Sequence, residues 1–464
     1  MEATAHRNNA IRPSVLTLQK VAMKRSLALS SAPLHPLSPP LTKPRPSHDD
    51  PPHFDAHHRA FRSTQVDSEV GTLRKVLTHR PGRELRRLLP GNHADLLFDE
   101  IPWLEAAQAE HDRFTGLLQE NGVETVELSS VLTAALAAPD VCRQVASVAA
   151  RPQHLGRALA ASVHDLLISA NAARRTELLL TGMTLGELAA YSPHSVSSAL
   201  SARAHRSDWF VLPPLVNSMF VRDSSSWIGD RYRANSMASQ TRRMESRLLR
   251  AAADAAGAQR IREREPFEPA ALEGGDLLLA GAGCVVIGVG ERTTAAAAEQ
   301  TAQSLLTSGL ATHVFAVLLP NERQCMHLDT LMTMVDQESF LVSGVHRDQC
   351  HWFSLRLNAD ATVRADSLDD PFTALASALG LRGIRLIETG DDEVTMQREQ
   401  WSDAANVLAL RPGTVIAYDR NTMANDRLSA AGITVLTVPS AELVRGRGGP
   451  HCLSCPLVRD PLTT

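Results

Sequence analysis

The order of apolar and polar positions predicts that strands and helices alternate in the first ordered part of the chain. Residues 70–79 have the apolar and β-branched content of a strand and stop at a turn signal, Arg80-Pro81-Gly82. Residues 103–120 repeat apolar side chains at helical spacing and end at an Asn-Gly pair. Residues 123–128 alternate as a strand does. This segment is therefore predicted to be a β, α, β unit.

Between residues 129 and 204 the pattern changes to short helices rich in alanine and leucine. Thr184 and Glu187 have the spacing of a capping box, which would open the last of these helices. We interpret residues 129–204 as an α-helical bundle inserted into an α/β protein, with a structural or covering role. Its helices are predicted over residues 131–138, 140–149, 152–169, 172–180 and 185–191.

The alternation of strands and helices returns after residue 205. Residues 276–280 and 284–289 predict a hairpin with a glycine turn, followed by a helix over 293–308 and a strand over 313–319. The same order recurs with strands over 407–410 and 413–418, a helix over 421–431 and a strand over 433–438. A recurring unit suggests a pseudo-symmetric arrangement around a central site. Residues 65–128 and 205–464 are thus assigned to one α/β domain.

Residues 1–64 differ from the rest of the chain. Prolines and histidines recur there without apolar periodicity, which predicts a disordered N-terminal extension. A basic and then weakly apolar stretch begins at residue 23, but its apolar part is too short and too polar for a signal peptide. A misassigned start explains the segment equally well, so we assign it no function.

Composition narrows the class of protein. The chain has 464 residues, 44% of them hydrophobic and 21% charged, which is ordinary for a globular enzyme with one large core or two domains. A net charge of −4 provides no field that would attract nucleic acid or an acidic membrane, and no apolar run reaches the length of a membrane span. Six cysteines in a chain of this length do not form a disulfide scaffold, which favours a reducing, cytoplasmic location.

The candidate chemistry is concentrated near the C-terminus. Cys452 directly follows His451, after a glycine-rich stretch that begins between Arg445 and Arg447. Neighbouring cations lower the pKa of a thiol, so we expect Cys452 to be a nucleophile in an electropositive setting. A buried structural cysteine is the alternative. Cys452 and Cys455 also form a CxxC pair, but no second such pair provides the other ligands of a zinc site.

Three more polar clusters lie where predicted strands end, which are positions that often carry function. They span residues 217–223, 273–276 and 326–330. Taken singly each is weak, because residues 273–276 also fit a simple turn and His327 also fits a structural histidine. His327 and Asp329 are two residues apart, so on an extended segment both side chains face the same side. That geometry would suit a single site.

Together these clusters resemble the guanidine-modifying superfamily, and specifically the arginine deiminase family. The resemblance runs from about residue 67 to residue 460, and its motifs occur in the family's order. It implies an α/β fold, a pseudo-five-fold α/β propeller with an inserted helical bundle. The motifs that carry it are residues 73–82, 220–223 with Trp227, 272–276, 290–294, 326–330, 398–401 with 406–409, and 445–459.

The resemblance implies hydrolysis of free L-arginine by water to L-citrulline and ammonia, in arginine catabolism. Cys452 would attack the guanidinium carbon and form a covalent amidino-cysteine. His327 would protonate the departing ammonia and then activate the water. Asp223 and Asp329 would bind the guanidinium nitrogens through charge-assisted hydrogen bonds. Glu273 would orient His327 and balance its charge.

The resemblance also implies residues that bind the rest of the substrate. Asn217, Arg242 and Arg292 would bind the α-carboxylate, for which an arginine fork is well suited. Phe220 would pack along the substrate's aliphatic stem, and Arg447 would be a mobile loop arginine that lies near the thiol before substrate arrives. For Arg242, a solvated position on a helix is the alternative interpretation.

The covalent thiol route implies no metal and no organic cofactor. We expect a homo-oligomer whose partners are L-arginine and water, with no nucleic acid and no membrane. The alternatives are an amidinotransferase, which needs room for an acceptor amine, an agmatine deiminase, which does not need the carboxylate-binding arginines, and a non-catalytic arginine-binding protein. Val221 and Ser218 depart from the family pattern beside the site. These departures bear on affinity more than on reaction type.

Overall fold

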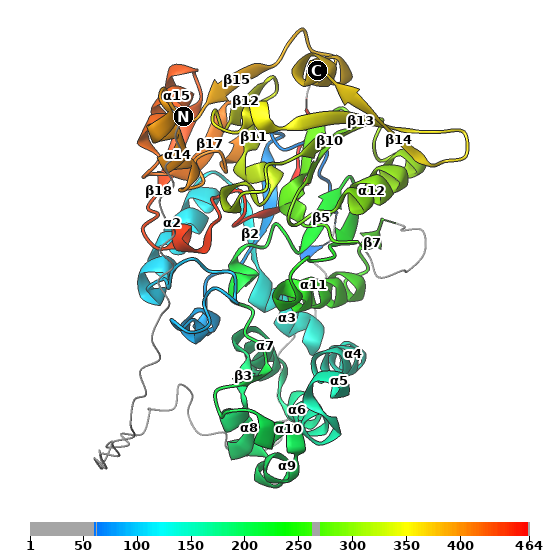
Figure 1. The fold of residues 1–464 in the computed structure, drawn as a ribbon, viewed down its shortest axis with the longest axis vertical. Helices are drawn as coiled ribbons and strands as arrows, with labels where there is room; N and C mark the ends of the chain where they lie inside the picture. Colours follow the sequence, from blue (N-terminus) through cyan, green and yellow to red (C-terminus); the bar gives the residue numbers. More distant parts are fainter. Residues whose placement is uncertain (1–59, 62, 262–269, 463–464) are drawn as a thin grey trace, which may run out of the picture. The chain divides into compact units, whose positions relative to one another are not determined.

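The computed structural model describes residues 60–61, 63–261 and 270–462 of the chain (Figure 1). The disordered extension predicted over residues 1–64 therefore falls almost wholly outside the described residues. The described part is a mixed α/β structure, as predicted. Within that part, no helix has both the length and the apolar content needed to cross a membrane.

The two ends of the described chain meet in one sheet. Strand β1 (Leu73–Thr78) pairs in parallel with β2 (Glu124–Glu127) and antiparallel with the C-terminal strand β19 (Cys455–Arg459). Helix α2 (Leu104–Glu120) connects β1 to β2, so the predicted β, α, β unit is confirmed. Because β19 directly follows the loop that contains Cys452, the pairing of β19 with β1 anchors this loop to the first strand of the described chain.

Five sheets of the described chain share one strand pattern, an antiparallel pair followed by a parallel third strand. The first is β19–β1–β2. The others are β5–β6–β7 (Ser225–Ile228, Arg231–Ala234, Gln259–Arg260), β8–β9–β10 (Leu277–Gly281, Cys284–Val289, His313–Leu318), β11–β12–β15 (Met332–Asp336, Ser339–Val342, Arg385–Glu388) and β16–β17–β18 (Leu408–Arg411, Thr414–Tyr418, Thr434–Val438). Strands β13 (His351–Leu357) and β14 (Val363–Leu368) extend the third of these sheets beyond β10.

Both predicted hairpins are confirmed, as β8–β9 and β16–β17. The helices predicted to follow them are α12 (Ala295–Ser308) and α15 (Thr422–Ala430). Each precedes the parallel third strand of its sheet, because two parallel strands need a crossover connection, which is usually a helix. The remaining helices among these sheets are α11 (Arg243–Ala255), α13 (Pro371–Leu379) and α14 (Glu393–Gln400).

Residues 128–204 are almost entirely helical, and Figure 1 shows these helices gathered together. The predicted helix over 152–169 is in fact two helices, because Gly156 has a φ of +75° that interrupts it. The capping box of Thr184 and Glu187 is confirmed. The helices are α3 (Leu128–Leu136), α4 (Pro139–Ala149), α5 (Pro152–Leu155), α6 (Arg157–Ser169), α7 (Ala172–Thr181), α8 (Leu185–Tyr191), α9 (Pro193–Ser198) and α10 (Leu200–Ala204), and β3 (Met183–Thr184) pairs with β4 (Phe210–Leu212).

The apolar core connects these helices with the sheets. One cluster of buried side chains includes Leu159 and Leu188 of the helices together with Val221, Trp227 and Ile287. A second cluster surrounds the C-terminal loop and contains Phe220, Tyr418 and Cys452. The boundaries of an inserted helical domain stay a prediction. Because these helices share a core with the sheets, we do not expect residues 129–204 to fold independently.

Candidate functional site

Cys452 lies in the loop between the 3-10 helix η9 (Leu443–Gly446) and β19, and Asn406 holds this loop in place. The amide nitrogen of Cys452 donates to Oδ1 of Asn406 at 3.1 Å, and Nδ2 of Asn406 lies 3.2 Å from the sulfur. The same Nδ2 donates to the carbonyl oxygen of Asp329 at 3.0 Å. A Cβ on Gly449 would lie 2.5 Å from the carbonyl oxygen of Asn406, so only glycine allows this close approach.

The thiol of Cys452 lies among carboxylates. It is 3% exposed, and its sulfur is 3.5 Å from Oδ2 of Asp329. Burial, followed by the negative charges of Asp329, Asp223 and Asp403, raises the pKa of Cys452 well above its ordinary value. The hydrogen bond from Asn406 acts in the opposite direction. These surroundings therefore favour the protonated thiol of Cys452.

The prediction of an electropositive setting is thus wrong, because the flanking arginines bind other groups. Arg445 pairs with Glu100 and with Glu442. The guanidinium of Arg447 lies over the ring of Trp401, 3.6 Å from its centre, and its Nε is 3.2 Å from Oδ2 of Asp99. The two arginines are close to Cys452 in the sequence, but the contacts of their side chains are with Glu100, Glu442, Asp99 and Trp401.

His327 lies between two buried carboxylates. Its Nε2 is 2.9 Å from Oε2 of Glu273, and its Nδ1 is 3.7 Å from Oδ1 of Asp223. Burial disfavours the charged ring, but the carboxylates of Asp223, Glu273 and Asp276 outweigh that cost and raise the pKa of His327 to about 10. A Cβ on Gly275 would lie 2.8 Å from Nδ1, so the glycine pair after Glu273 gives the imidazole its space.

The expectation that His327 and Asp329 lie on an extended segment is wrong. His327 is extended, but Asp329 belongs to the 3-10 helix η7 (Leu328–Thr330). The turn is held by Asp276, whose Oδ1 accepts from the amide of Leu328 at 2.8 Å. The two side chains therefore contact different residues. His327 contacts Glu273, and Asp329 contacts Cys452.

Arg242 is buried and is bound by carboxylates. Its Nη1 lies 2.6 Å from Oδ2 of Asp223, and its Nη2 lies 2.9 Å from Oε2 of Glu245. Nη2 also donates to the carbonyl oxygens of Asn217 and Phe220. The alternative of a solvated helix position is therefore wrong for Arg242. In this structure it occupies one of the two carboxylates predicted to bind the substrate's guanidinium.

The other predicted substrate-binding residues lie around this centre. Nη1 of Arg292 is 3.5 Å from Oε2 of Glu273. Nδ2 of Asn217 donates to the carbonyl oxygen of Leu96 at 2.9 Å, and the ring of Phe220 lies 6.5 Å from that of Phe98. Arg447 lies over Trp401 and is one of the residues that line a cavity of about 640 Å³.

The structure brings the five predicted catalytic residues into one buried centre, each at most 3% exposed. It also adds residues to which the sequence analysis assigned no role. Asn406 lies within one of the family motifs, but the sequence analysis assigned it no role. Its position directly before the apolar strand predicted over residues 407–410 is a signal that could have identified it as a site residue. His451 contacts both Asp329 and Glu69, and nothing in the sequence pattern brings Glu69 to this centre.

Among the described residues, two groups of side chains have donor atoms close enough to hold a metal ion. Asp223, Glu273 and His327 form one group, with all donor atoms within 4.8 Å of one another. In this group Arg242 and Arg292 already bring positive charge to the two carboxylates. The second group lies outside the centre and consists of Glu322, Cys325 and His346.

Comparison with known proteins gives one consistent result. The family model for arginine deiminase matches residues 94–459. An arginine deiminase of Mycobacterium marinum is 44% identical over 402 residues, which cover 85% of this chain and 98% of that protein. One of Rhodococcus erythropolis is 42% identical over 401 residues, covering 86% and 98%. An amidinotransferase of Microseira wollei from the saxitoxin biosynthetic pathway has a similar fold, with a TM-score of 0.50, 13% identity, and coverage of 86% of this chain and 98% of that one.

Proposed function

Because this chain belongs to the arginine deiminase family, we propose that it hydrolyses free L-arginine to L-citrulline and ammonia. The observation that carries the proposal is the buried centre in which a thiol, an imidazole and three carboxylates lie within reach of one another. Such a centre suits a planar cation that has to be held, attacked at carbon and split. The roles below are proposals for this chain.

Substrate binding would itself activate the nucleophile. The guanidinium would bind to Asp329 and Asp223, replacing Arg242 on the latter carboxylate. Its positive charge would offset the two carboxylates that now raise the pKa of Cys452, so that the thiolate forms when substrate is present. The empty enzyme would keep a protonated and unreactive thiol.

The chemical steps follow from the protonation states. The thiolate of Cys452 forms a bond to the guanidinium carbon, and His327, which is protonated before substrate arrives, gives its proton to the departing amine. The C–N bond breaks, ammonia leaves and an amidino-cysteine remains. Neutral His327 then takes a proton from water, whose oxygen attacks the same carbon. The C–S bond then breaks and releases the thiolate. The proton left on the new hydroxyl group is taken up by the released ammonia, so that citrulline and ammonium leave.

Selectivity for a free amino acid would come from the second half of the site. Once released from Asp223, Arg242 would pair with the α-carboxylate together with Arg292, with Asn217 completing the contact. Phe220, buried at 4% exposure, would pack along the aliphatic stem. Because the centre is closed, entry would require movement, and the contacts of Arg447 with Trp401 and Asp99 are where we expect the loop to open.

We also propose that the five similar sheets form a pseudo-five-fold propeller around this centre. Their common strand pattern and the pairing of β19 with β1 support such a closed arrangement. A reducing, cytoplasmic location would keep the nucleophile free, and all six cysteines are free thiols. A homo-oligomer stays a prediction.

The first experiment measures citrulline and ammonia released from L-arginine by the purified chain, by Cys452→Ser and by Cys455→Ser. Equimolar products that disappear only in Cys452→Ser are expected, because the buried Cys455 sulfur contacts Ser225 instead of the catalytic residues. Agmatine and a blocked peptidyl arginine are run in parallel. Turnover of agmatine would refute the roles of Arg242 and Arg292, and binding of arginine without turnover by the unmodified chain would refute the enzymatic proposal.

A further inference from the structure

The ring of His451 lies between two buried carboxylates. Its Nδ1 is 2.8 Å from Oδ2 of Asp329, and its Nε2 is 3.2 Å from Oε2 of Glu69. All three side chains are at most 4% exposed. An ionised carboxylate can only accept hydrogen bonds, so both ring nitrogens have to donate, and a ring that donates from both nitrogens carries a positive charge.

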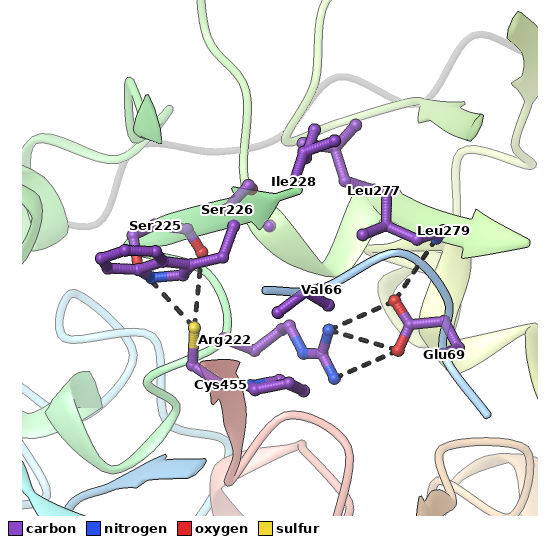
Figure 2. Close-up of a pocket in the computed structure, with 12 residues that line it drawn as sticks. Val66, Glu69, Arg222, Ser225, Ser226, Ile228, Leu277, Leu279 and Cys455 are labelled. Carbon is purple, nitrogen blue, oxygen red and sulfur yellow. Dashed lines mark hydrogen bonds and ion pairs between the residues drawn. The ribbon is translucent and has the colours of Figure 1, made fainter. Parts of the chain in front are cut away.

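Glu69 is itself firmly held. Its carboxylate pairs with Arg222 at 3.4 Å and accepts from the amide of Leu279, as Figure 2 shows. Burial opposes ionisation of Glu69, but Arg222 and His451 outweigh it and hold the pKa of Glu69 well below its usual range. Glu69, Arg222 and Cys455 are among the residues that line a small pocket of about 20 Å³ (Figure 2).

Arg222 connects this pair to the backbone of the catalytic loop. Its Nε donates to the carbonyl oxygen of Ser454 at 3.0 Å, and its amide donates to the carbonyl oxygen of Cys452 at 3.3 Å. Glu69 therefore binds Nε2 of His451, the ring nitrogen that does not contact Asp329. Its partner Arg222 binds the catalytic loop at the carbonyl oxygens of Cys452 and Ser454.

The two oxygens of Asp329 are used differently. Oδ2 takes the contact from His451 and lies 3.5 Å from the sulfur of Cys452. Oδ1 is buried and has no hydrogen-bond partner among the described residues. If the carboxylate is held through one oxygen, the other stays directed at the position where a substrate N–H would arrive.

We propose that His451, held by Glu69, is a positioning residue that orients Asp329 and places a positive charge behind the carboxylate nearest the thiol. The inference rests on the proposed function, in which Asp329 binds the guanidinium and Cys452 attacks it. His451, the residue directly before Cys452, would then provide the positive charge that offsets the negative charge of Asp329 beside the thiol.

The charged and titratable groups around His451 come from several elements. Asp329 faces it from η7, Glu69 from the segment before β1, and Cys452 from its own loop. Arg222 binds Glu69 and the carbonyl oxygen of His451, and Arg459 of β19 lies near Glu69. A pH dependence that changes on substitution of His451 has to be judged against all of these groups.

The test uses His451→Gln in the full chain and measures two quantities. The first is the rate at which iodoacetamide alkylates Cys452 as a function of pH, followed on the Cys452 peptide by mass spectrometry. The second is kcat/KM for L-arginine. Glutamine cannot donate to both carboxylates and has no charge, so the alkylation profile should move to higher pH. Near neutral pH both quantities should fall by about tenfold or more, since one pKa unit changes the thiolate fraction tenfold.

His79 provides a matched control. Its Nδ1 lies 2.8 Å from Glu127 and its Nε2 lies 3.2 Å from Glu84, so it repeats the geometry of His451 at a buried place outside the catalytic centre. His79→Gln removes the same kinds of contact and should lower the stability, with kcat/KM and the alkylation profile of the folded enzyme unchanged. An equal shift in both variants would assign His451 a merely structural role and overturn the proposal.

Glu69→Gln gives a second, nearly isosteric test. It should shift the alkylation profile in the same direction as His451→Gln, and the double variant should be no worse than His451→Gln alone, because Glu69 acts through His451. If alkylation and turnover of both variants stay within about twofold of the unmodified chain, the proposal is overturned. The alkylation assay needs no turnover, so a chain that fails to hydrolyse arginine would refute the proposed function while still deciding the role of His451.

Discussion

The charge around Cys452 is set by residues that are distant in the sequence. Asp223 and Asp329 lie more than a hundred positions upstream, yet their charges act on the sulfur, whereas the nearby Arg445 and Arg447 bind elsewhere. Asn406 is the polar group in direct contact that favours the thiolate. At the residue scale the reactivity of the thiol therefore depends on this amide and on the occupancy of the two carboxylates.

Replacement of Asn406 by leucine tests this at similar side-chain size. The change removes the hydrogen bonds to the sulfur, to the Cys452 amide and to the Asp329 carbonyl. We expect kcat to fall by about 100-fold, as for loss of one donor to a developing anion, and the free energy of unfolding to fall by about 1–3 kcal/mol. Steady-state kinetics and urea denaturation measure the two effects.

Asn425→Leu is the control for this substitution. Asn425 donates to the carbonyl oxygen of Tyr418 at 3.0 Å from helix α15, outside the catalytic centre. It should lose stability and keep its kcat. If Asn406→Leu also keeps the kcat of the unmodified chain, the amide has no part in activating the thiol.

At the scale of elements, strand β19 anchors the catalytic loop. It pairs with β1 over nearly its whole length, and Leu457 at its centre is fully buried. Arg459 donates to the carbonyl oxygen of Gly71 at 2.7 Å, which joins the strand to the segment just before β1. A loop fixed in this way can keep Cys452 in hydrogen-bond contact with Asn406, although the loop lies close to the C-terminus.

Leu457→Ala should therefore cost about 2–5 kcal/mol of stability, the usual range for a buried leucine. Leu200 is 82% exposed on α10, and Leu200→Ala should change the stability by less than about 0.5 kcal/mol. Urea denaturation followed by circular dichroism compares the two. A Leu457→Ala variant as stable as Leu200→Ala would show that β19 contributes little to holding the fold.

At the scale of the whole molecule, several buried histidines give the stability a pH dependence. Burial disfavours the charged forms of His79 and His327, but neighbouring carboxylates outweigh it and raise the pKa of each to about 10. His111 lacks such a partner among the described residues, and burial lowers its pKa to about 4. The two kinds of site destabilise the fold at opposite ends of the pH range.

We expect the free energy of unfolding to fall as pH rises from about 6.5 to about 10. In the unfolded chain these histidines lose their protons near pH 6.5, whereas His79 and His327 keep theirs in the fold, so their contribution is complete below 6.5 and lost as pH passes 10. Urea denaturation at several pH values measures this, and His79→Gln should flatten the slope. Constant or rising stability up to pH 10 would contradict the assigned charges.

Local patterns predicted much of the fold. Helix α2 was expected over residues 103–120 and spans Leu104–Glu120, and both predicted hairpins and the Thr184 capping box are present. These features depend on side-chain periodicity and turn residues within a few positions of one another. Strands β11 to β15 were missed, because they are not separated by the strong glycine signals that mark the predicted hairpins.

The family, the first β, α, β unit, the two hairpins and the residue types of the centre followed from the sequence, since each rests on motifs or periodicities that are contiguous in the chain. The tertiary structure alone decided which charges meet. It showed Arg242 on Asp223, Arg447 over Trp401 and His451 between Asp329 and Glu69. The physical reason is that electrostatic interactions depend on distance and burial, and the groups that set the state of Cys452 are brought together only when distant segments pack.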